Sequence, residues 1–403
     1  MRSFPLPGGD RLTSSLQRID IGFSAAVFLV ALAASLVFIR WYPPPIPVYD
    51  AVEYQRIAHH LAAGKGFSLD GVRPYAQRPP LLPFLLGAWT WMAGTSLVSA
   101  AVFQCLMHSL SAAAAYLLFR VVPCAPRRSL LLSLIVALQP MLLTRTAFIL
   151  LEPTLLFFTT SALLATVLWL REKTSAWACA AGLLWGIATL GKAATLFVLP
   201  FAIVYRLARG RERRGVAFRQ AALFGLLFLA VLAPWTARNY IQFQRLIPVS
   251  DQTAGLVQEW YASRAIQAGS SAGESGGAAL VERLVRNTKD FTSPARDWWW
   301  ARGRYGPGEA RPWYWTLHDI FHRFLYLVLL YRVFQTFRGK FPASRGFIAL
   351  FCFLYWAEHS LILGIPRYAI PIYTALLALL IPYRERAWGS AAGEEGLRLS
   401  WNS

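Results

Sequence analysis

The chain has 403 residues, of which 56% are hydrophobic and only 15% are charged, and its mean hydropathy is +0.42. Soluble domains carry about 25% charged residues, so this composition excludes an ordinary soluble protein and indicates a membrane protein. The net charge of +20 does not indicate nucleic-acid binding, because the arginines stand in short clusters between apolar runs and not on one soluble face.

Six basic clusters separate the apolar runs and together predict the topology. They are Arg2 with Arg11 and Arg18; Arg120 with Arg127 and Arg128; Arg171 with Lys173; Arg206 through Arg219; Arg332 through Arg345; and Arg384 with Arg386. Basic residues near membrane spans favour the cytoplasmic side. Placing all six clusters there determines whether the number of crossings between neighbouring clusters is odd or even.

The first apolar run, residues 21–39, is long enough to cross a membrane, and no small-residue cleavage site follows it. We therefore predict a transmembrane helix followed by an outer loop at 41–97. Within this loop, residues 50–63 have the pattern of an amphipathic helix on the membrane surface. Its apolar positions, at helical spacing, are Tyr54, Ile57, Ala58 and Leu61. Residues 80–93 are short and contain prolines, so we predict that they also stay at the outer interface.

The remaining apolar runs complete an all-α bundle of about ten transmembrane helices, with both termini inside. The predicted crossings are 98–119, two hairpins within 128–171 and 173–206, and then 217–235, 320–337, 347–363 and 368–382. The second hairpin is short, so its tip at Gly191 and Lys192 should lie below the outer surface.

Residues 1–383 are thus one transmembrane domain, and residues 384–403 are a cytoplasmic tail. A large outer loop, 238–319, separates the seventh and eighth helices. It contains a Gly/Ser/Ala stretch at 269–277, which we expect to be flexible, and tryptophan-rich segments at 298–300 and 313–315. The sequence shows no internal repeat.

Ionisable residues gather at the outer ends of the predicted helices, where they are costly unless paired or functional. Those residues are Asp50, Glu53, Glu152, Lys192, Arg238, Glu358 and Arg367. Each has an ordinary structural alternative. Asp50 is a possible helix N-cap, Glu152 a possible partner of Arg145, and Glu358 with His359 a possible hydrogen-bonded pair. The cations are possible snorkelling side chains.

No metal site or disulfide framework is predicted. His59 and His60 are adjacent, so on a helix their rings point about 100° apart, and no third outer ligand has suitable spacing. The chain has no DxD motif, and its four cysteines lie in or beside apolar runs.

Several short motifs, in this order, resemble the protein O-mannosyltransferase and aminoarabinose-transferase-like superfamily of GT-C glycosyltransferases, from about residue 19 to residue 383. They are Asp50-Ala-Val-Glu-Tyr54; Gly64-Lys-Gly-Phe67; Arg78-Pro-Pro-Leu-Leu-Pro83; Leu151-Glu152-Pro153; Gly186-Ile-Ala-Thr-Leu-Gly-Lys192; Pro234-Trp-Thr-Ala-Arg-Asn-Tyr240; and Arg367-Tyr368 with Pro371. The resemblance implies a GT-C-like bundle that transfers sugar from a polyprenyl-phosphate donor on the extracytoplasmic side. The chain departs from some relatives in lacking a C-terminal outer domain.

The resemblance also implies roles for individual residues. Asp50 matches the catalytic acidic residue and Glu152 the second acidic position, while Lys192 and Arg367 match cations near the donor phosphate. Inverting transfer needs a base for the acceptor hydroxyl and positive charge on the departing phosphate, and Asp50 is the predicted base. Further predicted substrate-binding residues are Glu53, Tyr54, Arg78, Arg238 and Tyr368.

The expected partners are the lipid-linked sugar donor, a lipid, glycan or protein acceptor, and membrane lipids, with neither nucleic acid nor cofactor. The expected location is a prokaryotic cytoplasmic membrane with the active site facing outward. Two alternatives stay open: a transporter or flippase, and a non-catalytic binder of polyprenyl-linked sugars. A transporter should carry midplane charges related between two halves, which this sequence lacks.

Overall fold

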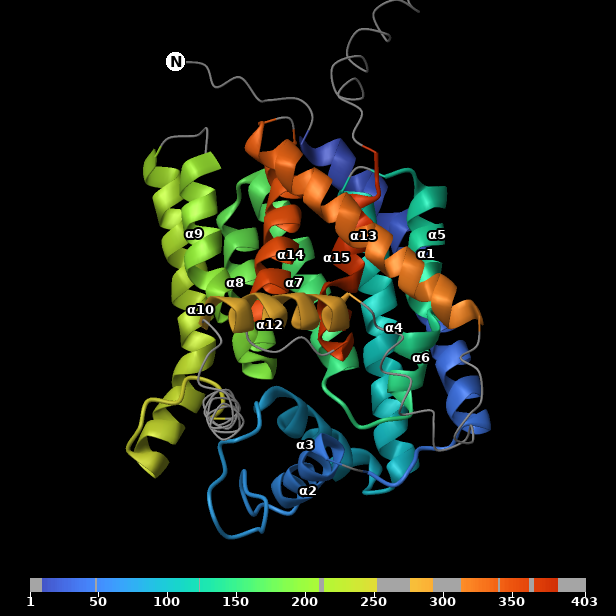
Figure 1. Ribbon diagram of the computed structural model, residues 1–403, viewed down its shortest axis with the longest axis vertical. Coiled ribbons are helices and arrows are strands. Elements are labelled where there is room, and N and C mark those ends of the chain that lie inside the picture. The colour runs from blue at the N-terminus through green and yellow to red at the C-terminus, as the bar shows by residue number, and fades with distance from the viewer. Residues whose placement is uncertain are drawn as a thin grey trace, which may run out of the picture.

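Helices form nearly all of the chain that the computed structural model describes, which is residues 9–47, 49–122, 124–209, 214–251, 276–292, 313–339, 341–361 and 366–382. In chain order they are α1 (Gly9–Trp41), α2 (Asp50–Ala62), α3 (Leu81–Ala93), α4 (Leu97–Val121), α5 (Pro126–Leu138), α6 (Pro140–Thr146), α7 (Glu152–Glu172), α8 (Ser175–Gly191), η1 (Ala193–Phe197), α9 (Val198–Arg209), α10 (Arg214–Phe243), α12 (Gly276–Phe291), α13 (Trp313–Phe337), α14 (Ala343–Leu361), η3 (Pro366–Ile372) and α15 (Tyr373–Leu379). The strand-like pairing in these residues is one isolated bridge, Ser68 to Pro74. The predicted all-α architecture is confirmed (Figure 1).

Four described helices are long and apolar enough to cross a membrane: α1 from Asp20 onward, α4, α7 and α10. A fifth candidate is the pair α5 and α6, which is bent by 49°. The bend falls at Pro140, where an interior proline clashes with the preceding turn and interrupts an α-helix. The chain is an integral membrane protein, as predicted. The count of about ten crossings stays a prediction, because several of the apolar helices are shorter than the roughly 20 residues a crossing needs.

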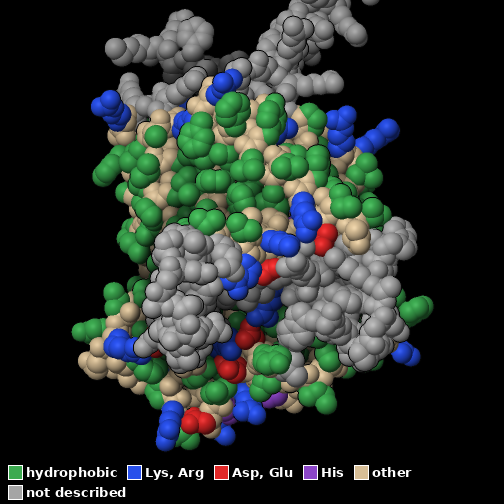
Figure 2. Space-filling model, in the orientation of Figure 1, with side chains coloured by type: hydrophobic (Ala, Val, Ile, Leu, Met, Phe, Trp, Pro, Cys, Tyr) green, Lys and Arg blue, Asp and Glu red, His purple; other side chains and the backbone are tan. Residues whose placement is uncertain are grey.

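The described residues in and beside the basic clusters lie at one end of the bundle, because a bond joins each such group to the next one along the chain. These bonds are Arg120 Nε to Asp20 Oδ1 (2.7 Å), Arg171 Nη1 to the Val121 carbonyl, Arg219 Nη2 to Ser175 Oγ (3.2 Å), Arg209 Nη2 to the Thr336 carbonyl (3.0 Å) and Arg345 Nη1 to the Ile381 carbonyl (2.9 Å). Figure 2 shows Lys and Arg side chains along the upper edge, above a broad hydrophobic band. A topology with all basic clusters on one side of the membrane requires this arrangement.

The predicted first outer loop lies at the opposite end of the bundle, where α2 and α3 pack side by side (Figure 1). The apolar face of α2 is buried as its spacing predicts, with Tyr54 and Ala58 packed in one cluster with Leu82 and Leu86 of α3. α3, which contains most of residues 80–93, lies beside α2 at this end of the bundle (Figure 1). The loop therefore presents the first turn of α2, with Asp50 and Glu53, at the end of the bundle away from the basic clusters.

Two glycines on α8 let it pack directly against α10. A Cβ on Gly182 would lie 2.4 Å from the Phe224 carbonyl oxygen, and a Cβ on Gly186 would lie 2.9 Å from the Phe228 carbonyl oxygen. Small residues four apart allow such close backbone approach between helices in membranes. This contact holds the hairpin whose tip carries Lys192.

Gly182→Ala should therefore destabilise the protein by about 1–3 kcal/mol, because the new methyl group meets backbone that cannot move aside locally. The measurement is the midpoint of thermal unfolding in detergent. Gly225→Ala on α10 is the matched control, because a Cβ there first meets Ile203 Cδ1 at 3.4 Å, an ordinary contact. Equal midpoints for the two variants would contradict the close approach.

α10 is longer than predicted. α10 continues through Pro234 to Phe243, whereas the sequence placed the start of the loop at 238. Trp235 Nε1 donates to the Val249 carbonyl (2.6 Å), and Asn239 Nδ2 donates to the Ile247 carbonyl (3.0 Å). These tertiary bonds hold the helix together beyond the proline.

The helices from α12 to α15 also differ from the predicted ones. α12 forms inside the large loop, and α13 starts at Trp313 because residues 313–319 contain no proline or glycine to stop it. The last predicted crossing, 368–382, is a 3₁₀ segment followed by the short α15. Pro371 has no N–H for an α-helical ladder, and its carbonyl accepts from Thr159 Oγ1 at 2.9 Å. Residues 269–275, 298–300 and 384–403 and the side chains of 313–315 lie outside the described residues.

The predicted topology can be tested with cysteines introduced at Ser271, in the large loop, and at Gly210, between α9 and α10. In intact cells an impermeant thiol reagent should label the first and not the second. The natural Cys105, Cys124 and Cys352 are buried and Cys179 is half-buried, so the unsubstituted chain gives a low background. Labelling of both positions, or of Gly210→Cys alone, contradicts the outward active site.

Candidate active site

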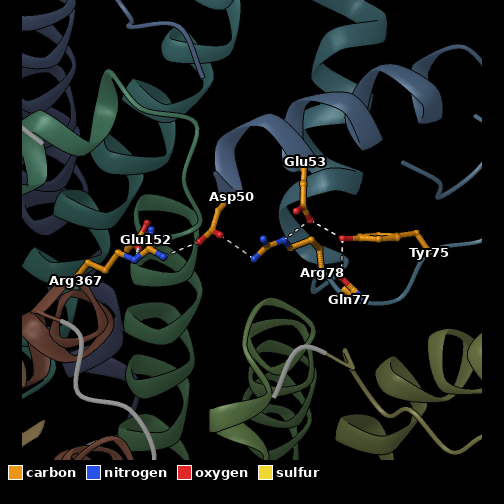
Figure 3. A network of polar contacts seen from close by, with 7 residues as sticks. All are labelled: Asp50, Glu53, Tyr75, Gln77, Arg78, Glu152 and Arg367. Atoms are coloured by element: carbon orange, nitrogen blue, oxygen red, sulfur yellow. Dashed lines mark hydrogen bonds and ion pairs between the residues drawn. The ribbon is translucent and has the colours of Figure 1, made fainter. Parts of the chain in front are cut away.

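Asp50 is the first residue of α2, and its carboxylate is held between two arginines (Figure 3). Arg367 Nη2 donates to Asp50 Oδ2 at 2.6 Å. Arg78 Nη1 lies 2.9 Å from Asp50 Oδ1, an ion pair by distance that lacks hydrogen-bond angles. The cap position of α2 is Tyr49, and no side chain caps the helix. The alternative of Asp50 as N-cap is therefore wrong.

Arg78 also binds Glu53, one turn after Asp50 on α2. Its Nε lies 2.6 Å from Glu53 Oε2, and the same oxygen accepts from the Tyr75 hydroxyl at 2.6 Å. Burial alone would raise the pKa of Glu53, but the hydrogen bonds from Arg78 and Tyr75 outweigh it and lower the pKa below its usual value. Glu53 is therefore ionised at neutral pH, and its negative charge stabilises the guanidinium of Arg78.

Tyr54, the residue after Glu53 on α2, is buried beside Arg78. The Arg78 guanidinium carbon is 5.9 Å from the centroid of its ring. Burial and then the charge of Asp50 raise the pKa of the Tyr54 hydroxyl above its usual range, so it stays protonated. Tyr54 thus supports Arg78.

Glu152 begins α7 and joins the same cluster from the other side. It is 6% exposed, and its Oε1 lies 3.5 Å from Arg367 Nε. Its second oxygen, Oε2, is buried and has no hydrogen-bond partner in the described part of the chain. Arg367 therefore bridges Asp50 and Glu152, two residues that are far apart in the sequence.

Lys192 follows α8 at the tip of the short hairpin, as predicted. Its Nζ lies 3.1 Å from the centroid of the Tyr368 ring, which is a close cation–π contact. No carboxylate of the described residues forms an ion pair with it, although Glu152, Glu358 and Asp50 all act on it electrostatically. The lysine is therefore a cation beside the acidic cluster, and its ammonium group rests on an aromatic face.

Arg238 lies apart from this group. Its Nη1 donates to the Tyr75 carbonyl (2.9 Å) and its Nη2 to the Phe67 carbonyl (3.1 Å), and its guanidinium stacks 5.0 Å from the Trp235 ring centroid. These bonds tie the first outer loop to α10. Its part in phosphate binding stays a prediction.

Eight of the nine predicted site residues therefore come together at one end of the bundle: Asp50, Glu53, Tyr54, Arg78, Glu152, Lys192, Arg367 and Tyr368. The sequence did not predict Tyr75 as part of the site, because no distinctive motif surrounds it. The sequence also favoured a hydrogen-bonded pair of Glu358 with His359. His359 Nδ1 instead contacts the Tyr355 carbonyl at 2.8 Å. Among the described residues no group of His, Cys, Asp and Glu could hold a metal ion.

Comparison with known proteins bears on this arrangement. Residues 49–246, just under half of the chain, match the family model described as dolichyl-phosphate-mannose-protein mannosyltransferase. The segment includes six of the eight clustered residues but neither Arg367 nor Tyr368. Among curated proteins, no sequence matches the chain.

Solved structures share the fold. One is the oligosaccharyltransferase AglB from Archaeoglobus fulgidus, in complex with an inhibitory peptide and a dolichol-phosphate. It has TM-score 0.57 and 16% identity over 93% of this chain and 51% of that one. Another is ArnT from Cupriavidus metallidurans bound to undecaprenyl phosphate, with TM-score 0.54 and 13% identity over 97% of this chain and 64% of that one. The chain thus spans only half to two thirds of their length. The predicted resemblance to the GT-C superfamily is confirmed.

Proposed function

Starting from this GT-C fold and from the mannosyltransferase match over residues 49–246, we propose that the chain is a glycosyltransferase. It moves a sugar from a polyprenyl-phosphate donor to an acceptor hydroxyl on the extracytoplasmic side of a prokaryotic cytoplasmic membrane. Residues 1–383 act as one transmembrane domain. The similar AglB and ArnT structures hold dolichol-phosphate and undecaprenyl phosphate, which supports a lipid phosphate as the donor carrier.

The observation that carries the proposal is the cluster of three cations and three carboxylates at one end of the bundle. Arg78, Lys192 and Arg367 lie among Asp50, Glu53 and Glu152. Four parts of the sequence that lie far apart supply them, namely residues 50–78, Glu152, Lys192 and Arg367, so the cluster depends on the whole fold. It also lies at the end opposite the basic clusters, where a lipid-linked sugar would be presented outside.

The reaction follows from the chemistry of these side chains. Asp50 accepts the proton of the acceptor hydroxyl, and the oxygen attacks the anomeric carbon of the sugar. The bond from that carbon to the phosphate oxygen breaks, and the phosphate leaves with the electron pair. Lys192 and Arg367 stabilise the negative charge that develops there, Lys192 as a compact charge and Arg367 as a planar fork. A single displacement inverts the anomeric configuration.

Arg367 couples donor binding to the base. Its Nη2 donates to Asp50 Oδ2 at 2.6 Å, so a donor phosphate that binds this guanidinium competes with Asp50 for it. Asp50 then keeps its ion pair with Arg78, while Oδ2 becomes available to an acceptor hydroxyl. Glu152, the other partner of Arg367, holds the guanidinium during the exchange.

The direct test is transfer by the purified chain in liposomes. Undecaprenyl-phosphate sugars are supplied with candidate lipid, glycan and peptide acceptors, and the release of undecaprenyl phosphate is measured with the mass of the product. Release together with a glycosylated acceptor supports the proposal. Movement of the intact donor across the bilayer would instead indicate a flippase, and binding without release would indicate a non-catalytic lipid-binding protein.

A further inference from the structure

Three buried polar atoms close to Lys192 have no hydrogen-bond partner in the described residues: Glu152 Oε2, Glu358 Oε2 and the Tyr355 hydroxyl. Glu152 is 6% exposed and Tyr355 is fully buried. Leaving such groups unpaired is costly, and the great majority of buried polar atoms in proteins have partners. Several unpaired buried atoms in one region point to a ligand that completes their bonds.

The residues that carry these atoms lie in one region, since Lys192 contacts Tyr368, and Arg367 next to Tyr368 pairs with Glu152. Tyr355 and Glu358 are three residues apart on α14, so they share one face of that helix. Glu358 and Glu152 both act electrostatically on Lys192, and Tyr355 is acted on by both of these carboxylates. The His359 ring lies between the Tyr355 ring (4.3 Å) and the Tyr368 ring (5.4 Å), which in turn carries Lys192. The region therefore adjoins the proposed phosphate site on the α14 side.

The chemistry of the region excludes most parts of a lipid-linked donor. A prenyl chain has no polar group for these atoms, and a phosphate would be repelled by two carboxylates. Carboxylate oxygens accept hydrogen bonds, and a tyrosine hydroxyl donates and accepts them. A ring bearing several hydroxyl groups, beside aromatic faces, satisfies all three atoms.

We propose that Glu358 and Tyr355, together with Glu152, bind hydroxyl groups of the donor's sugar and so form its recognition subsite. This inference rests on the proposed function, because it takes the phosphate to lie at Lys192 and Arg367. It assigns the specificity for the sugar to α14. The cations that hold the phosphate do not distinguish one sugar from another.

The test compares two kinds of probe on the full chain in nanodiscs: undecaprenyl phosphate, and the same lipid phosphate carrying mannose, galactose or arabinose. The unsubstituted chain should bind at least one sugar-bearing probe more tightly than the bare phosphate. Glu358→Gln and Tyr355→Phe should weaken the binding of that probe by about tenfold to a hundredfold, as expected for the loss of hydrogen bonds to charged or buried groups. Neither variant should weaken the binding of undecaprenyl phosphate, because each keeps the cations that hold it, and this binding also shows that the variants fold.

Tyr205→Phe is the matched control. It removes another buried tyrosine hydroxyl, one that donates to the Ala343 carbonyl at the basic end, and it should leave the affinity for both probes unchanged. The proposed subsite is overturned if Glu358→Gln and Tyr355→Phe weaken the binding of both kinds of probe equally. It is also overturned if they weaken the binding of neither. So does an unsubstituted chain that binds all probes equally. An unsubstituted chain that binds no probe overturns the proposed function itself.

Discussion

Asp50→Asn should lower the rate of sugar transfer by a factor of roughly 10² to 10⁴, the usual contribution of a positioned general base. Asparagine keeps the size of the side chain but cannot take the acceptor's proton. Donor binding should survive, because Arg367 loses a competing carboxylate and becomes more available to the phosphate. The measurements are transfer in liposomes and the affinity for undecaprenyl phosphate in nanodiscs.

Glu53→Gln is the neighbouring control. Glu53 shares one face of α2 with Asp50, but its Oε2 is already occupied by Arg78 and Tyr75. Its loss should weaken the hold on Arg78 and slow transfer only modestly. If Glu53→Gln abolishes transfer while Asp50→Asn stays active, then Glu53 and not Asp50 is the base. If both variants stay fully active, the reaction proposed here is wrong.

The sequence predicted the end of the bundle at which the site lies, because a few strong signals determine it. Charge parity placed the basic clusters together, and helical spacing predicted the buried face of α2 with Tyr54, Ile57 and Ala58. Ionisable residues inside apolar runs are rare enough to be noticed one by one. These signals are local, and they brought Asp50, Glu152, Lys192 and Arg367 to one side.

Partner choice could not be predicted, since it depends on contacts between distant segments. Arg238 has the same sequence signal as Arg367, a cation near a proline at an outer helix end. In the structure Arg238 donates hydrogen bonds to the carbonyls of Phe67 and Tyr75, whereas Arg367 pairs with Asp50 and Glu152. The continuation of α10 from residue 235 to Phe243 was not predicted for the same reason, because its support comes from Val249 and Ile247.

Lys192→Ala should weaken the binding of undecaprenyl phosphate by about tenfold to a hundredfold, the contribution of a charge-assisted hydrogen bond. Lys192 forms no ion pair within the described residues and rests on the face of Tyr368, so its ammonium group is available to a phosphate. Removing it leaves the phosphate with Arg367, which is shared with Asp50 and Glu152. Affinity is measured in nanodiscs over a range of salt concentrations.

Two further variants separate the charge of Lys192 from its packing. Lys192→Met keeps an unbranched side chain against Tyr368 without the charge, so it should lose as much affinity as Lys192→Ala if the charge binds the phosphate. Lys192→Arg should recover part of the loss, because a planar guanidinium keeps the charge but does not reproduce a compact ammonium. If Lys192→Met binds undecaprenyl phosphate normally while Lys192→Ala does not, the lysine acts through packing against Tyr368. The phosphate must then be held by Arg367 alone, and the mechanism loses one of its two cations.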